Sequence, residues 1–236
     1  NGDLGRATLM RKMALDNASR ISQGLPKLEH SPAEKKEAFM EAYDSSLKIV
    51  KYLSGFAPVY VIFGNVESSN AETRKESKEI GLALPFLRDN LEKIKGVRII
   101  NNRVANFGGI RIGGLEYFVD ESWVRKFRPG DYGERLRNAM IESKKAKRVL
   151  RNFGQVDILL CHQPPLGVLD KVTARFAPKP WQGKHAGSKV IFDYVRREQP
   201  GYVFCGHIHE ARGHAKIGAS EVYNLGDAGY KMIEIN

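Results

Sequence analysis

The sequence is poor in cysteine and has no long apolar run. Its 236 residues include two cysteines, Cys161 and Cys205, and each lies in an apolar stretch. Two cysteines are too few for a zinc site built from thiolates, and their surroundings favour buried thiols over a disulfide. No apolar run approaches the roughly 20 residues that span a bilayer, and no signal segment is recognisable. We therefore expect a cytoplasmic protein with no membrane partner.

The start of the sequence also lacks something. The first residue is Asn1 rather than Met, and the stretch from Asn1 to Gly5 resembles the exit from a strand that is not present. A sheet without that strand would expose an edge. We therefore expect that residues 1–236 form a single domain whose first strand is missing from the sequence.

Positive charge is in excess. The chain has 38 Lys and Arg residues against 27 Asp and Glu residues, a formal net charge of +11. Such an excess can attract phosphate groups of nucleic acids or of small phosphoesters. Alternatively, the Lys and Arg side chains simply lie on the solvent-exposed faces of helices. Basic and acidic residues alternate in stretches such as Glu72–Glu79, which favours the second interpretation. A nucleic-acid partner is possible on this evidence but is not favoured.

Apolar periodicity and capping signals predict helices along the chain. Ser31-Pro32-Ala33-Glu34 has the pattern of a capping box with proline at the first helical position, so a helix should begin there. A loop is expected over 119–133, around Pro129-Gly130-Asp131, and a long loop from His162 to Gly187. The predicted helices cover residues 6–24, 32–54, 70–94, 134–152 and 188–198.

Short β-branched and aromatic runs alternate with these helices and predict strands. The order of elements is α/β in the first half, and strands gather toward the C-terminus. This pattern predicts an α/β fold, a four-layer α/β/β/α sandwich of two mixed β-sheets flanked by helices. The predicted strands cover residues 58–63, 97–100, 104–107, 110–115, 156–161, 202–205, 212–217, 221–224 and 230–235.

Polar side chains of metal-ligand type stand at four strand exits. In α/β sheets, sites form where the carboxyl ends of strands gather. A single exit of this kind is typical of a satisfied polar turn, whereas four such exits favour a metal site. Carboxylate, amide and imidazole ligands suit Mn, Fe, Zn, Co or Ni better than Ca or Mg, and we favour Mn. The candidate ligands are Asp3, Asn65, His162, His207 and His209.

This ligand series resembles that of the calcineurin-like metallophosphoesterases in order and in its strand-exit context. The resemblance extends from Asp3 to His209, and the last motif, between a strand and the turn at Asn224, is its most specific part. The series consists of Gly2-Asp3, Gly64-Asn65-x-Glu67, His162 and Gly206-His207-x-His209.

The resemblance implies two divalent metal ions and hydrolysis of a phosphoester by a metal-activated water. In this pattern Asp3 bridges the two metals, and His209 binds the second of them. The first metal is completed by Asn65, His162 and His207. The family's Asp-x-His motif, which supplies the remaining ligands of the second metal, is absent from this sequence.

One departure from the family pattern concerns proton transfer. The residue after Gly-Asn is usually a histidine that protonates the leaving group, and here it is Val66. His185, in the long loop before a helix N-terminus, is a candidate substitute, although it could equally be a surface histidine. Ser188 and Glu67 are candidates for supporting roles next to substrate or metal, Glu67 by bracing Asn65 or a metal-bound water.

Three functions remain open on the sequence. The leading hypothesis is a metal-dependent phosphoesterase acting on a phosphomonoester or phosphodiester. Val66 motivates the alternative of a weakly active or inactive metal-binding scaffold on the same fold. The net charge motivates the third, a nuclease.

Overall fold

The computed structural model of the chain describes residues 2–127, 133–175 and 177–235. The predicted loop residues Pro129-Gly130-Asp131 lie outside this part. The chain divides into two compact units, Gly2–Ile99 and Ile100–Asn236, which we call the N-terminal and C-terminal units and describe separately. Among the described residues no helix is long and apolar enough to span a bilayer.

The N-terminal unit contains four helices and a parallel pair of strands. Ser31 and Glu34 form the predicted capping box at the start of α2, which confirms that helix start. Residues of α2, α4 and both strands form its core, including Val50, Val61 and Leu91. The elements are α1 (Thr8–Ser22), α2 (Pro32–Ser54), β1 (Val59–Val61), α3 (Asn70–Ile80), α4 (Leu87–Leu91) and β2 (Val97–Ile99).

The prediction of one helix over residues 70–94 is wrong. Helix α3 ends at Ile80, because Gly81 adopts a left-handed conformation with φ of 69°, which is typical of a helix C-terminus. Pro85 follows, and a proline disfavours helical backbone in the residue before it. A new short helix, α4, then begins at Leu87. Four apolar residues of this range, at the spacing of one helix face, are nevertheless all buried and divided between the two helices and their connection: Ile80, Leu84, Leu87 and Leu91.

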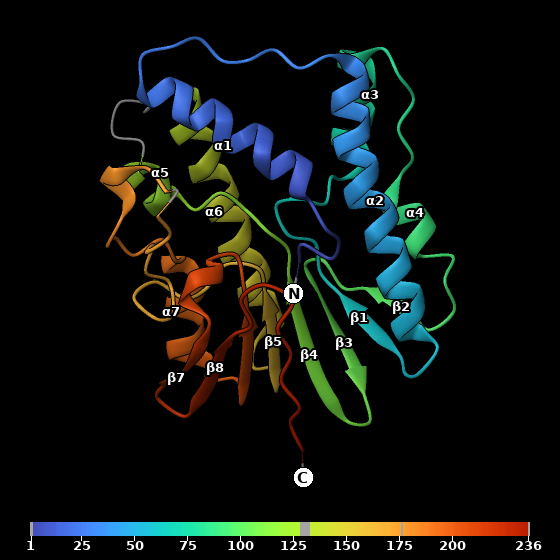
Figure 1. The fold of residues 1–236 in the computed structure, drawn as a ribbon. Helices are drawn as coiled ribbons and strands as arrows, with labels where there is room; N and C mark the ends of the chain where they lie inside the picture. The colour runs from blue at the N-terminus through green and yellow to red at the C-terminus, as the bar shows by residue number, and fades with distance from the viewer. Residues whose placement is uncertain (1, 128–132, 176, 236) are drawn as a thin grey trace. The chain divides into compact units, whose positions relative to one another are not determined.

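The C-terminal unit is built on a six-stranded sheet with the order β3-β4-β5-β6-β8-β7 (Figure 1). Strands β4, β5, β6 and β8 are parallel to one another, and β3 and β7 are antiparallel strands at the two edges. The strands are β3 (Arg103–Phe107), β4 (Ile110–Leu115), β5 (Ile158–Cys161), β6 (Tyr202–Cys205), β7 (Gly213–Ile217) and β8 (Ser220–Asn224).

Helices α6 and α7 cover one face of this sheet and bury its core. Side chains from β5, β6 and β8, such as Leu159, Val203 and Val222, pack against Leu150 of α6 and Ile191 of α7. Because the four central strands are parallel, their carboxyl ends lie at one edge of the sheet. The helical elements are α5 (Glu121–Phe127), α6 (Glu134–Phe153), α7 (Lys189–Glu198) and the short 3-10 turns η1 (Lys179–Trp181) and η2 (His209–Ala211).

Two further predictions for the C-terminal unit are wrong. Helix α5 lies within the predicted loop 119–133, because the Asp120 side chain accepts the Ser122 N–H and caps a helix too short to show periodicity. The expected strand near Tyr230–Ile235 is absent from the described residues, in which the chain after Asn224 is irregular up to residue 235.

The predicted fold class is confirmed. The chain has an α/β fold with seven α-helices and two sheets among the described residues, and the larger sheet is mixed. Cys161 and Cys205 are free and buried, as expected. Burial raises the pKa of the Cys161 thiol to about 12 and that of Cys205 well above its ordinary value, so both stay protonated and unreactive.

Leu159→Ala is a test of the sheet core, since Leu159 on β5 has no exposed surface. We expect the free energy of unfolding to fall by about 2–5 kcal/mol, measured by urea denaturation. Ile141→Ala on the exposed face of α6, where Ile141 is 61% exposed, is the control and should change it by less than about 0.5 kcal/mol. Equal effects of the two substitutions would contradict this placement of the core.

Candidate active site

In the N-terminal unit, the structure brings Asp3 to the turn that follows β1. The backbone N–H of Val66 donates a hydrogen bond to Asp3 Oδ1, with a distance of 3.0 Å. Asp3 adopts a left-handed conformation with φ of 48°, which aspartate tolerates better than most residues. Asn65 is exposed in the same turn. Two of the five predicted metal ligands therefore belong to one local structure.

Glu67 is the residue that holds this local structure together. Its carboxylate accepts hydrogen bonds from the backbone N–H groups of Asp3 (2.8 Å), Leu4 (2.6 Å) and Gly64 (2.7 Å). It therefore ties the segment around Asp3 to the end of β1. We expected Glu67 to contact Asn65 or a metal-bound water. Its three hydrogen bonds come instead from the backbone N–H groups of Asp3, Leu4 and Gly64.

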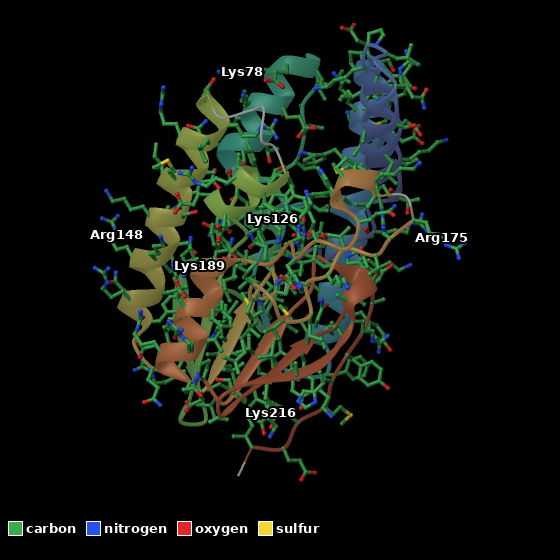
Figure 2. The ribbon with its side chains drawn as sticks, turned by 90° about the vertical axis from the view of Figure 1, so that its left-hand side faces the viewer. Lys78, Lys126, Arg148, Arg175, Lys189 and Lys216 are labelled. Carbon is green, nitrogen blue, oxygen red and sulfur yellow. The ribbon has the colours of Figure 1, made fainter. Side chains whose placement is uncertain are left out.

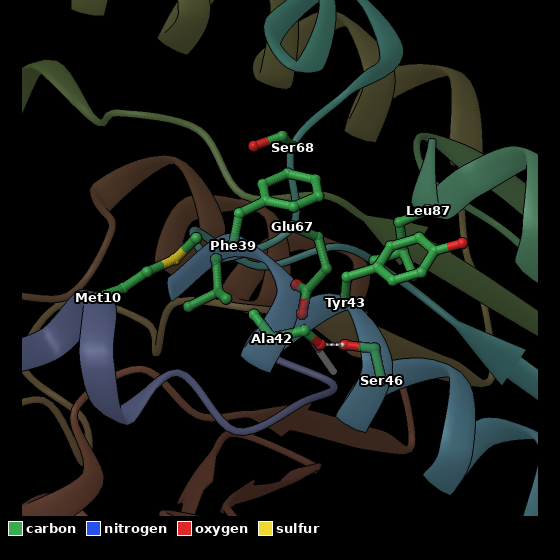
Figure 3. A pocket seen from close by; sticks show the side chains of 9 residues that line it. Met10, Phe39, Ala42, Tyr43, Ser46, Glu67, Ser68 and Leu87 are labelled. Atoms are coloured by element: carbon green, nitrogen blue, oxygen red, sulfur yellow. Dashed lines mark hydrogen bonds between the residues drawn. The ribbon is translucent and has the colours of Figure 1, made fainter. Parts of the chain in front are cut away.

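Glu67 makes these bonds in apolar surroundings. Its side chain lines a small pocket with Met10 of α1, Phe39 and Tyr43 of α2, and Leu87 of α4 (Figure 3). Burial, and secondly the negative charge of Asp3, raise the pKa of Glu67 to about 7.

In the C-terminal unit, the exits of β5 and β6 bring two predicted ligands into contact. His162 follows β5, His207 follows β6, and their ring atoms Nε2 and Nδ1 are 3.1 Å apart. The backbone continues the pairing of these parallel strands, since the Gly206 N–H donates to the His162 carbonyl at 2.9 Å. His162 is buried, with 1% of its surface exposed, and His207 is half-buried.

The backbone around His207 is strained. The Ile208 N–H donates to the Gly206 carbonyl at 2.7 Å, which closes a three-residue turn centred on His207. The φ of His207 is 65°, so this is the rarer form of the γ-turn. Strained backbone of this kind concentrates at functional sites. His209, two residues on, begins the turn η2 and is half-buried.

Tyr117 completes an aromatic cluster with the two histidines and was not predicted from the sequence. Its ring centroid lies 5.6 Å from that of His162 and 5.6 Å from that of His207. Tyr117 follows β4, which is the parallel neighbour of β5. The strand-exit argument that selected the histidines would have found it, had aromatic residues been included with the metal-ligand types.

The long loop from His162 to Gly187 is ordered around a buried aspartate. Asp170 Oδ1 lies 2.6 Å from Nδ1 of His185, and its Oδ2 accepts the N–H groups of Gly167 and Gly187. Lys126 of α5 donates to the His185 carbonyl at 2.8 Å. His185 is thus held at both its ring and its backbone, although half of its side chain is exposed.

This loop packs against the turn that carries His207 and His209. The Asn224 side-chain amide donates to the carbonyls of Leu169 in the loop and Ile208 in the turn, at 2.9 and 3.0 Å. Ile208 also packs in one apolar cluster with Ala186, the residue after His185. Glu210 accepts the N–H groups of residues 173 and 174. His185 and the histidine turn are therefore held in one neighbourhood.

Ser188 makes structural hydrogen bonds at the start of α7. Its hydroxyl is buried, accepts the Ile191 N–H as the cap of α7, and donates to Asp120 Oδ2 at 2.5 Å. Asp120, also buried, caps α5 through its other oxygen. The pair therefore joins the N-termini of two helices, and the predicted supporting role of Ser188 next to substrate stays a prediction.

The two imidazoles of the C-terminal unit lie at hydrogen-bond distance from each other, and this separation is also one that two ligands of a single divalent metal can have. With metal–nitrogen bonds of about 2.0–2.1 Å, two neighbouring ligand nitrogens on one metal are roughly 3.0–3.4 Å apart. The 3.1 Å between His162 Nε2 and His207 Nδ1 agrees with that spacing. Within residues 2–127, 133–175 and 177–235, no three or more His, Cys, Asp or Glu side chains form a group that could hold a metal ion.

Comparison with protein families gives the affiliation of the chain. The family model for calcineurin-like phosphoesterases matches residues 33–211, well over half of the sequence. The chain belongs to the calcineurin-like phosphoesterase family. Members of this family generally use divalent metals. Asn65, His162, His207 and His209 lie within the matched residues, and Asp3 precedes them.

Solved structures agree with this fold. One aligns with 94% of this chain and 77% of its own length, at 15% identity and a TM-score of 0.55. The phosphopantetheinyl hydrolase of Mycobacterium tuberculosis covers 77% of this chain and 73% of its own, at 15% identity and a TM-score of 0.47. A Thermus thermophilus protein, TT1561, covers 92% and 84%, at 13% identity and a TM-score of 0.40. Only the first supports an argument, and it supports the fold alone. No curated protein matches the chain significantly.

Glu67→Ala should release the segment around Asp3. We expect amide hydrogen exchange at Asp3 and Leu4 to accelerate and the free energy of unfolding to fall by about 1–3 kcal/mol, because three backbone donors lose their buried acceptor. Glu79→Ala is the control, since Glu79 is exposed and pairs with Lys75 at the surface. Unchanged exchange at Asp3 and Leu4 in Glu67→Ala would contradict the anchoring role.

Proposed function

We propose that this protein is a metal-dependent phosphoesterase that hydrolyses a phosphomonoester or phosphodiester. The observation that carries the proposal is the convergence of His162 Nε2 and His207 Nδ1 at 3.1 Å, in a chain that belongs to a phosphoesterase family. Two features support it. The γ-turn at His207 is strained, and strained backbone concentrates at functional sites, while Glu67 fixes the segment that carries the candidate ligand Asp3.

The ligand roles follow the family's motif series. In the C-terminal unit, His162, His207 and His209 would contribute ligands to divalent metal. In the N-terminal unit, Asp3 and Asn65 are the residues that the same motif series assigns to metal binding. Such a centre supplies an activated water and neutralises charge on the phosphoryl oxygens. The chain's own contribution is to hold the ligands still, by the β5 and β6 exits in one unit and by Glu67 in the other.

Val66 has no titratable group, so it cannot supply the proton for the leaving group. His185 is the candidate, since its ring is half exposed and its loop packs on the turn of His207 and His209. A general acid contributes about 10²–10⁴-fold to such reactions, and its value rises with the basicity of the leaving group.

Two other functions remain as outcomes of the tests below. A metal-binding scaffold is favoured by Val66 and would bind divalent metal without turnover. A nuclease is less favoured, because the basic side chains of the C-terminal unit are dispersed over several elements (Figure 2). Many of them also pair with acids, as Lys147 does with Glu121 and Lys189 with Asp193.

Hydrolysis of p-nitrophenyl phosphate or its bis-ester should require a divalent metal. We expect chelator-treated protein to be inactive and to recover with Mn²⁺, and we expect His162→Ala to lose roughly 100-fold or more of kcat/KM. His214→Ala is the matched control, because His214 lies on β7 with its ring bonded to Glu221, and it should keep full activity. Metal binding without turnover by the unmodified protein would overturn the proposal in favour of a scaffold.

His185→Ala tests the leaving-group acid. We expect it to slow hydrolysis of an alkyl phosphoester by about 10²-fold or more and to slow a p-nitrophenyl ester much less, because nitrophenolate leaves without a proton. The measurement is kcat/KM for both substrates with the same metal. Unchanged hydrolysis of the alkyl ester would show that His185 is a surface histidine with no part in catalysis.

A further inference from the structure

Asp170 is among the most deeply buried charged side chains of the described residues, and it lies in a loop rather than in the core. Its exposed surface is 1%, and it has three hydrogen-bond donors around it. Nδ1 of His185 is 2.6 Å from Oδ1, and the N–H groups of Gly167 and Gly187 are 2.8 and 2.9 Å from Oδ2. A buried carboxylate needs such donors, because an unpaired buried charge is very costly.

The backbone around Asp170 is shaped to reach this carboxylate. Gly187 passes so close that an added Cβ would lie 2.8 Å from Asp170 Oδ2 and 2.6 Å from the Pro165 carbonyl. Gly167 has a φ of 82°, a conformation that glycine adopts without strain. Glycine at 187 permits the close approach, and glycine at 167 adopts its backbone conformation without strain, so both N–H groups reach Oδ2 while Oδ1 is bonded to His185.

The hydrogen bond from His185 determines the state of its ring. With a carboxylate oxygen at Nδ1, the neutral ring keeps its proton on Nδ1, and Nε2 is the atom available to the half-exposed side. When the ring is protonated, Nε2 carries the proton that can be given away.

We propose that Asp170 is the positioning residue for His185, and that the two act as a carboxylate–imidazole pair that protonates the leaving oxygen of the phosphoester. This inference rests on the proposed function and extends it to a residue outside the family's motif series. Asp170 does not touch the substrate. It fixes the tautomer and orientation of His185, whose loop is held on the His207–His209 turn by Asn224 and Ile208.

The proton balance of this step is complete. As the bond between phosphorus and the leaving oxygen breaks, the Nε2 proton of His185 passes to that oxygen and the alcohol departs. Water adds to phosphorus and loses one proton to solvent, and His185 regains one from solvent. The Nδ1–H bond to Asp170 stays in place throughout, so the carboxylate is never protonated.

Asp170→Asn is the variant that separates positioning from structure. Asparagine has nearly the same shape, but it presents one oxygen and one NH₂ group. If its oxygen accepts from Gly167 and Gly187, its NH₂ faces Nδ1 and forces the neutral ring into the other tautomer. We expect kcat/KM for an alkyl phosphoester to fall about 10–100-fold and that for a p-nitrophenyl ester to fall less than about 3-fold.

Two controls make the test specific. Asp193→Asn on α7, where Asp193 is partly exposed and paired with Lys189, should change neither rate. In a His185→Ala background, Asp170→Asn should have no further effect on the alkyl ester, because residues that act as a unit are not additive. An equal loss with both esters, or an additive loss in the double variant, would overturn the inference and indicate a purely structural aspartate.

A second readout does not depend on catalytic activity, and its first measurement is made on the unmodified protein. Nitrogen-15 chemical shifts of the His185 ring in the unmodified protein should show the Nδ1–H tautomer at high pH, and Asp170→Asn should convert it to Nε2–H. A neutral ring protonated on Nε2 in the unmodified protein would overturn the inference, even if the variant fails to fold. Absence of turnover by the unmodified protein with any divalent metal would instead overturn the proposed function, and the catalytic role of Asp170 with it.

Discussion

Hydrogen bonds from backbone N–H groups to buried carboxylates hold the polar loops of this protein. A loop that packs against a core has backbone donors without helical or strand partners, and each needs an acceptor. Glu67, Asp120 and Asp170 supply it, and each accepts a backbone N–H from within three residues and at least one more from a segment 17 or more residues away. The candidate site residues Asp3 and His185 are attached to two of these three carboxylates.

The parallel strands of the C-terminal unit determine where its histidines lie. Because β5 and β6 are adjacent and parallel, the residues that follow them emerge side by side at one edge of the sheet. The cross-strand hydrogen bond from Gly206 to His162 extends that pairing one step past the strands. The ring contact of His162 and His207 is thus a consequence of sheet topology, with the γ-turn setting its final orientation.

The sequence was a good guide to elements with strong periodicity and a poor one to short elements. Helices α2 and α6 and strands β4 to β6 were predicted within a few residues, because their apolar patterns and capping signals are local. Helix α5 was missed, since seven residues are too few for a periodic signal and its cap, Asp120, looks like any loop aspartate. The break at Gly81 was missed because an apolar stripe continued across it.

The site was predictable to a similar extent. The approach of His162 to His207 followed from the strand-exit rule. By contrast, the attachment of Glu67 to the Asp3 segment and of Asp170 to His185 joins positions 64 and 15 residues apart, and nothing in the residue types marks either pair. Such contacts depend on how loops fold back on the core, and local sequence patterns carry no information about that packing.

The backbone at position 207 has a consequence for the balance between stability and chemistry. A φ of 65° is one that glycine adopts freely, whereas any side chain at this position, imidazole included, adds strain. The residue that the fold would prefer at this position and the residue that the proposed reaction needs are therefore different. Position 207 is one at which selection for a more stable protein alone would remove the histidine, so its presence is itself an indication that the histidine does something other than stabilise the fold.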